Sequence, residues 1–207
     1  MPQRVDQPVD ARPREATLEQ VADSERAGEG VSLGFFEWRA ELMTEDGLPG
    51  WLEAVVQMHG VDALLVTPHW GPNMVAEPVR HVRASAAALR SAGATLIAGH
   101  SAHVFHGIGD HTLFDLGDFI DDYARDPLLR YDLGILAMVT FEQSCPTEVE
   151  CVPLALDTCH TRLADEGEAA WVIGRLRRAC AALGTEVWER RGRAVVSWDR
   201  HEGTQPT

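Results

Sequence analysis

The sequence lacks any long hydrophobic run. None of its apolar stretches approaches the roughly 20 residues that a membrane-spanning helix needs. Its first residues, MPQRVDQPVDARPREATLEQ, also lack the apolar segment of a secretory signal. We therefore expect a cytoplasmic protein without a membrane span.

Paired cysteine motifs are missing as well. The four cysteines show neither CxxC spacing nor a zinc-finger pattern. We expect free thiols in a reducing compartment at all four positions: Cys145, Cys151, Cys159 and Cys180.

Positive charge is scarce. Eighteen Lys and Arg stand against 32 Asp and Glu, which leaves a formal net charge of −14. Such a surface repels phosphate backbones and anionic lipid, so a nucleic-acid partner is not expected. The acidic balance does favour holding a divalent cation.

Large apolar side chains are almost absent from residues 1–30, which therefore cannot bury enough surface to offset the entropy of ordering. We expect a polar, flexible leader over residues 1–45, one domain over residues 46–200 and a tail over residues 201–207. The sequence contains no internal repeat.

The domain opens with a strand–helix–strand pattern. A helix is expected over residues 51–60, followed by a buried strand in DALLVTPHWG (62–71). Helical spacing then covers residues 77–93 and stops at Gly93, and ATLIAGHSAH (94–103) repeats the strand pattern. Short connections between these segments predict a βαβ unit with parallel strands.

The second half of the sequence has a different pattern of expected strands and helices. A Gly-rich turn at residues 106–111 leads to a short strand and an acidic connection, after which strands alternate with one helix. The whole pattern predicts an α/β sandwich containing a mixed sheet. The expected segments are a hairpin of strands 133–142 and 147–156 around Cys145–Pro146, an amphipathic helix over 165–184, and a final hairpin of 185–192 with 193–199.

Histidines follow both strands of the βαβ unit. PHWG ends the first strand with His69, and GHSAH ends the second with His100 and His103. Sites form outside the carboxyl ends of such strands, and neutral imidazoles are good ligands for transition metals. Spacing alone leaves solvated loop histidines as an equal alternative. Asp115 or Asp118 of DLGDF could reach the same edge.

The other histidines carry weaker signals. His106 and His111 flank the Gly-rich turn, where they are either groups behind the metal ligands or solvated turn residues. No role is expected for the histidines at helix or tail positions, which are His59, His81, His160 and His201.

Three segments together resemble the capsule-synthesis CapA family of poly-gamma-glutamate synthesis proteins: VTPHWGPNM, AGATLIAGHSAHVFHGI and TLFDLGDFIDDY. The resemblance covers about residues 50–200. It implies a calcineurin-like metallophosphoesterase fold and a divalent metal, Mn, Fe or Zn, acting on a small-molecule or polymer substrate. By this resemblance His69, His100 and His103 are metal ligands, and Asn73 and Asp118 lie at the rim as catalytic residues. Many relatives read Leu-Gly-Asn-Phe where this chain reads Leu-Gly-Asp-Phe.

The family's earlier motifs are not found. Residues 1–60 contain neither the Gly-Asp motif nor the Asn-His motif that complete a two-metal centre in the family. The family's N-terminal strands are therefore expected to be missing, so that the metal site is partial and exposed sheet edges invite a second copy or a separate N-terminal partner.

Two further interpretations stay open. In one, the chain is a non-catalytic remnant or accessory subunit, truncated at its N-terminus. In the other, it is a single-zinc hydrolase that uses the three histidines as ligands and Asp118 or Asp115 as general base.

Overall fold

The computed structural model describes residues 63–120 and 126–198, which belong to one compact unit. The predicted leader, the helix expected over residues 51–60 and the tail all lie outside the described residues. The fold is α/β, with two sheets and two helices in the described ranges.

The smaller sheet contains the predicted βαβ unit. Its four strands run in the order β1-β2-β4-β3, with β1, β2 and β4 parallel and β3 antiparallel to β4. The prediction of a mixed sheet is therefore confirmed. The expectation of only a turn over residues 106–111 is wrong, because β3 lies within it. The strands are β1 (Leu65–Val66), β2 (Leu96–Ala98), β3 (Ile108–Gly109) and β4 (Thr112–Leu113).

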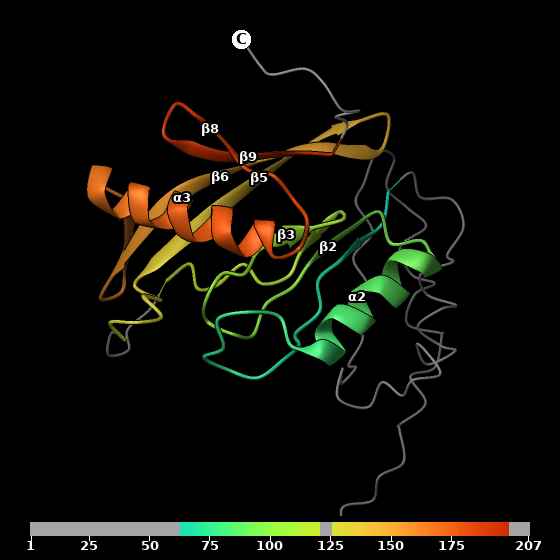
Figure 1. Cartoon of the computed structure of the whole chain (residues 1–207), viewed down its shortest axis with the longest axis horizontal. Coiled ribbons are helices and arrows are strands. Elements are labelled where there is room, and N and C mark those ends of the chain that lie inside the picture. The colour runs from blue at the N-terminus through green and yellow to red at the C-terminus, as the bar shows by residue number, and fades with distance from the viewer. Residues whose placement is uncertain (1–62, 121–125, 199–207) are drawn as a thin grey trace, which may run out of the picture. The chain divides into compact units, whose positions relative to one another are not determined.

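Helix α2 (Arg80–Ala92) connects β1 to β2, as predicted. It ends at Gly93, whose φ of 116° is a left-handed cap that glycine adopts at little cost. Its buried side packs against β2, on the side of the small sheet away from the larger one (Figure 1). The side chains of that buried face are Val82, Ser85, Ala86 and Leu89.

The larger sheet is antiparallel, in the order β5-β6-β9-β8, with β7 paired to β6. Both predicted hairpins are confirmed. The first turns at Gln143–Ser144, where both residues have positive φ, so Cys145 and Pro146 belong to β6 rather than to the turn. Strand β7 was not expected, and His160 lies on it rather than on a helix or tail. The strands are β5 (Leu133–Glu142), β6 (Cys145–Asp157), β7 (His160–Leu163), β8 (Trp188–Arg190) and β9 (Arg193–Ser197).

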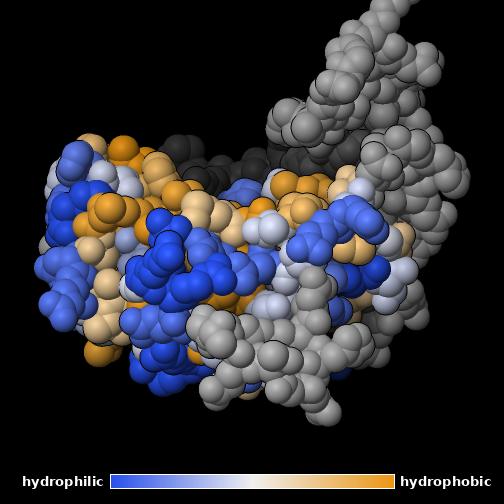
Figure 2. Space-filling model, turned by 90° about the horizontal axis from the view of Figure 1, so that it is seen from above, coloured by the Kyte–Doolittle hydropathy of each residue, from blue (hydrophilic) through white to orange (hydrophobic). Residues whose placement is uncertain are grey.

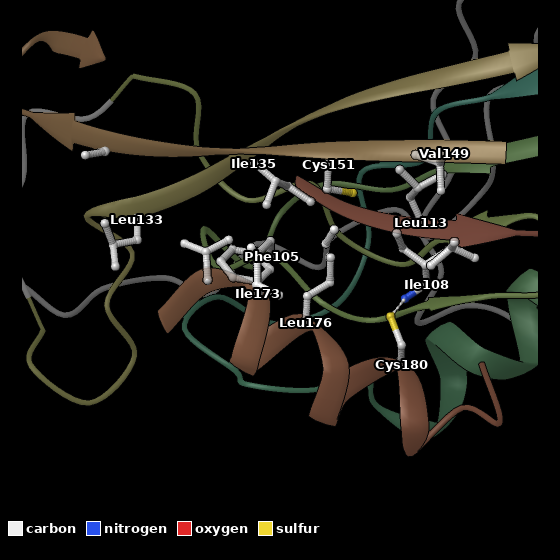
Figure 3. Close-up of a cluster of buried hydrophobic side chains, with 14 of the residues drawn as sticks. Phe105, Ile108, Leu113, Leu133, Ile135, Val149, Cys151, Ile173, Leu176 and Cys180 are labelled. Atoms are coloured by element: carbon white, nitrogen blue, oxygen red, sulfur yellow. Dashed lines mark hydrogen bonds between the residues drawn. The ribbon is translucent and has the colours of Figure 1, made fainter. Parts of the chain in front are cut away.

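Helix α3 (Glu166–Ala181) lies along the buried side of the larger sheet and also contacts β3 of the small sheet (Figure 1). It begins with a capping box. The Asp165 side chain accepts from the Glu168 backbone amide, and the Glu168 side chain accepts from the Asp165 backbone amide. Leu176 faces the larger sheet's buried side, and Phe105 brings the loop after β2 into the same core (Figure 3). One continuous core therefore joins α3 to both sheets.

All four cysteines are free, as predicted. Cys151 and Cys180 are core residues (Figure 3). Burial raises the pKa of Cys151 to about 12 and that of Cys180 to about 11, so both stay protonated at neutral pH. The Cys180 sulfur also accepts a 3.2 Å hydrogen bond from the Ile108 backbone.

The outer side of the larger sheet carries hydrophilic and hydrophobic patches side by side (Figure 2). Arg190 on β8 forms ion pairs with Glu148 and Glu150 of β6, while Leu136 and Met138 of β5 are exposed. None of the helices in the described residues is long and apolar enough to cross a membrane.

Candidate metal site

A parallel bridge brings His69 and His100 side by side just beyond β1 and β2. The Trp70 amide donates to the His100 carbonyl at 3.0 Å, and the His100 amide donates to the Pro68 carbonyl at 3.1 Å. Residues directly across parallel strands lie about 4.8 Å apart, so the two side chains leave the sheet together. The expected convergence of the two strand-end loops is therefore present for these two histidines.

The two imidazoles face each other through the same ring atom. The Nδ1 atoms of His69 and His100 are 3.1 Å apart, and the rings are inclined by 61°. Partial burial lowers the pKa of His100, and the charge of a protonated His69 nearby lowers it further. The unprotonated ring is thereby favoured, and it is the form that binds metal.

The separation of these nitrogens fits two ligands of one ion. Two imidazole nitrogens about 2.05 Å from a tetrahedral zinc lie about 3.3 Å from each other. The observed 3.1 Å is close to that value. The same distance also suits a hydrogen bond in which one imidazole donates to the other.

His103 is hydrogen-bonded to a carboxylate and not to His69 or His100. Its Nδ1 lies 3.0 Å and 3.1 Å from the two carboxylate oxygens of Asp118. An ionised carboxylate only accepts, so Nδ1 carries the proton and donates it. The Nε2 of a neutral His103 then has a free lone pair, as in histidines that bind a metal through one nitrogen and a carboxylate through the other.

The remaining predicted site residue, Asn73, belongs to neither pair. Asn73 lies in an exposed turn before α2, and no hydrogen bond among the described residues joins it to either histidine pair. Over residues 63–120 and 126–198, no three His, Cys, Asp or Glu side chains are grouped closely enough to hold an ion. The structure therefore assembles a two-imidazole pair and a separate His–Asp pair.

Asp115 occupies a different position from Asp118. It is only 2% exposed, and its carboxylate oxygens accept from the Ala102 and Gly117 backbone amides, each at 2.9 Å. Both oxygens are thus used within the protein. Asp118 is the carboxylate of this segment that reaches a histidine.

Gly99 marks the point where three segments meet. A Cβ there would lie 2.3 Å from the Trp70 indole nitrogen and 2.4 Å from the Phe114 carbonyl oxygen. These two atoms form a 2.8 Å hydrogen bond with each other. Glycine is therefore needed for close approach before the GHSAH loop.

The two histidines of the predicted Gly-rich turn are not solvated. His106 is 4% exposed, and its Nε2 donates to the Val75 carbonyl at 2.9 Å. Burial lowers the pKa of His106, and its Nδ1 is buried without a partner. His111 is half-buried against Trp198 and bonds Arg90. Because one ring is buried and the other half-buried in contact with other residues, the solvated interpretation is wrong for both. No hydrogen bond or ring contact between described residues joins either of them to the His69–His100 pair.

A family model supports the resemblance seen in the motifs. The model for the bacterial capsule synthesis protein PGA_cap matches residues 5–123, which is more than half of the chain. The chain belongs to this family. The matched region contains both histidine loops and Asp118, and it ends before β5. No curated protein matches the sequence.

The family match also reaches upstream of residue 50, into the segment predicted as a leader. That segment lies outside the described residues, so the leader and the domain boundaries stay predictions. The match and the motif resemblance overlap over residues 50–123, where the predicted site residues lie.

Proposed function

We propose that this chain takes part in capsular polymer synthesis as a metal-binding, hydrolase-like protein. His69 and His100 are the ligands of one divalent ion, Mn, Fe or Zn. The observation that carries this proposal is the 3.1 Å approach of their Nδ1 atoms at the carboxyl ends of two parallel strands. Membership of the PGA_cap family supports the link to capsule synthesis.

His103 is the third ligand that the family resemblance implies; it stands apart from the His69–His100 pair, and Asp118 orients its ring. A carboxylate on the other nitrogen fixes the tautomer and raises ligand basicity, as it does in many histidine metal sites. A bound ion of this kind lowers the pKa of a coordinated water and polarises a phosphoryl oxygen. The nominal reaction is hydrolysis of a phosphoester or a related bond in a small-molecule or polymer substrate.

A non-catalytic accessory role is the second candidate. It is favoured by the grouping of only two ligands within the described residues and by the missing Gly-Asp and Asn-His motifs. In that role the site binds an ion but needs ligands from a second copy or a separate partner before it can turn over substrate. Asn73, which is exposed and not hydrogen-bonded to either pair, would then have no catalytic part.

The test of metal binding compares the purified full chain with His69→Ala and His100→Ala variants. We expect zinc or manganese to bind the wild type in a titration. Each variant should weaken binding well beyond the roughly 10–100-fold loss typical of outer-shell substitutions. His160→Ala is the matched control, because His160 is an exposed histidine on β7 and should leave binding unchanged.

Equal affinity in the wild type and both variants would contradict the proposal and leave the imidazole–imidazole hydrogen bond as the state of the pair. Where metal does bind, p-nitrophenyl phosphate with added manganese separates the two candidates. Turnover that disappears in His100→Ala supports the hydrolase, and binding without turnover supports the accessory role.

A further inference from the structure

Asp115 is a buried carboxylate placed between the two loops that carry the site. It lies two residues after β4 (Thr112–Leu113), and 2% of its surface is exposed. Its Oδ2 accepts from the Ala102 amide and its Oδ1 accepts from the Gly117 amide. Its own carbonyl accepts from the His106 amide at 3.0 Å. One residue thus makes three bonds to the backbone around the histidines.

The first of these bonds lies in the turn between two proposed ligands. Ala102 separates Ser101 and His103, whose φ values of 140° and 61° are unusual for residues other than glycine. Such a backbone persists only when its surroundings hold it. The Asp115 carboxylate supplies part of that hold, and the Ser101 hydroxyl adds a bond to the Gly71 carbonyl.

The second bond reaches the residue next to Asp118. Gly117 has a φ of 70° and packs against the Phe105 backbone, so its position is closely set. Because the same carboxylate holds Ala102 and Gly117, it fixes the loop of His103 relative to the loop of Asp118. Their 3.0 Å contact depends on that spacing.

The two amide bonds compensate the burial of the Asp115 carboxylate. Burying such a group is unfavourable unless hydrogen bonds compensate it, and removing it would leave the Ala102 and Gly117 amides without their acceptor. A buried anion behind imidazole ligands is suited to a site that holds a cation.

We propose that Asp115 is a positioning residue, which holds the GHSAH loop and the Asp118 loop in the geometry needed for metal binding without touching the ion. This inference rests on the proposed metal site. The two carboxylates of DLGD then have different roles: Asp118 binds the His103 ring, and Asp115 binds backbone amides.

The experiment is a zinc titration of the full chain, of Asp115→Asn and of Asp126→Asn. Asparagine keeps one acceptor oxygen and removes the charge and the second acceptor. Asp126 is the matched control, because its carboxylate also accepts from two backbone amides, those of Leu128 and Leu129, away from the histidine loops. We expect zinc affinity to fall about 10–100-fold in Asp115→Asn and to be unchanged in Asp126→Asn.

Two further measurements separate positioning from general folding. The absorption spectrum of bound cobalt should change in Asp115→Asn and not in Asp126→Asn, since ligand geometry sets that spectrum. Amide hydrogen exchange in the metal-free chain should accelerate at Ala102 and Gly117 while the core strands stay protected.

Wild-type affinity and spectrum in Asp115→Asn would overturn the inference. So would failure of both Asp115→Asn and Asp115→Ser to fold, because Asp115 would then be a general folding residue. If the wild type binds no zinc, the proposed metal site fails, and hydrogen exchange decides the positioning role alone. Acceleration confined to the two loops supports that role, and uniform or absent acceleration overturns it.

Discussion

The small mixed sheet and the larger antiparallel sheet differ in the length of their strands and in the contacts that fix them. Strands of the mixed sheet are two or three residues long, and specific polar contacts join the loops that extend them. Strands β5 and β6 contain 10 and 13 residues, and their inner side packs on α3. Both sheets share one apolar core, but the loops that carry the histidines depend in addition on a few defined hydrogen bonds.

The family match follows the same division. It ends at residue 123, so it includes the mixed sheet and stops short of the larger one. Loops positioned by a rigid scaffold are where binding residues concentrate. The comparison therefore predicts that changes in the core lower overall stability, whereas changes at the loops act on metal binding.

The largest expected effect is Leu176→Ala on α3. Leu176 is fully buried in the core between the sheets, and truncating such a residue costs about 2–5 kcal/mol of unfolding free energy. Urea denaturation measures this loss. At low denaturant, zinc affinity should match the wild type, and a large loss of affinity in folded Leu176→Ala would break the proposed division.

Gly99→Ala should lower both the stability and the zinc affinity. The added methyl group would meet the Trp70 indole and the Phe114 carbonyl, and both are held by their mutual hydrogen bond. We expect a loss of about 1–3 kcal/mol in unfolding free energy from the overpacking. Zinc affinity should fall as well, because Gly99 precedes His100. A methyl group at Gly174 on α3 would meet only the end of the Arg178 side chain, in ordinary contact at 3.7 Å, so Gly174→Ala serves as the control.

The smallest effect concerns acid stability. Hydrogen bonding to Arg162 lowers the pKa of Glu168 to about 2, below its usual value of 4.5. The charged form is thus favoured in the folded state, so its contribution is full above pH 4.5 and is lost as pH falls toward 2. Because the pair is near the surface, we expect less than about 1 kcal/mol. Glu168→Gln should flatten this part of the stability–pH curve, and an unchanged curve would contradict the expectation.

Much of the fold could be predicted from periodicity. Helical spacing with Gly93 at its end predicted α2, and long alternating runs predicted the β5–β6 hairpin. Strands β3 and β7 were missed because two- and four-residue strands contain too few positions to show an alternating pattern. Their pairing comes from the neighbours they meet, which lie elsewhere in the chain.

The site was predictable to a similar extent. Two histidine-bearing strand ends indicated that His69 and His100 would meet, since parallel strands end at the same edge. The position of DLGDF after a strand indicated that Asp115 or Asp118 could reach the same edge, but not that Asp118 pairs with His103 while Asp115 is buried. Both depend on how the DLGDF segment folds back over the GHSAH loop.

By itself, the sequence determined which of the longer segments become strands and helices and which strands end in histidines, because these properties depend on local periodicity and turn residues. Only the tertiary structure decided which imidazole faces which partner. That choice depends on the register of the bridge between His69 and His100, and a shift of one residue would turn one ring to the opposite side of the sheet.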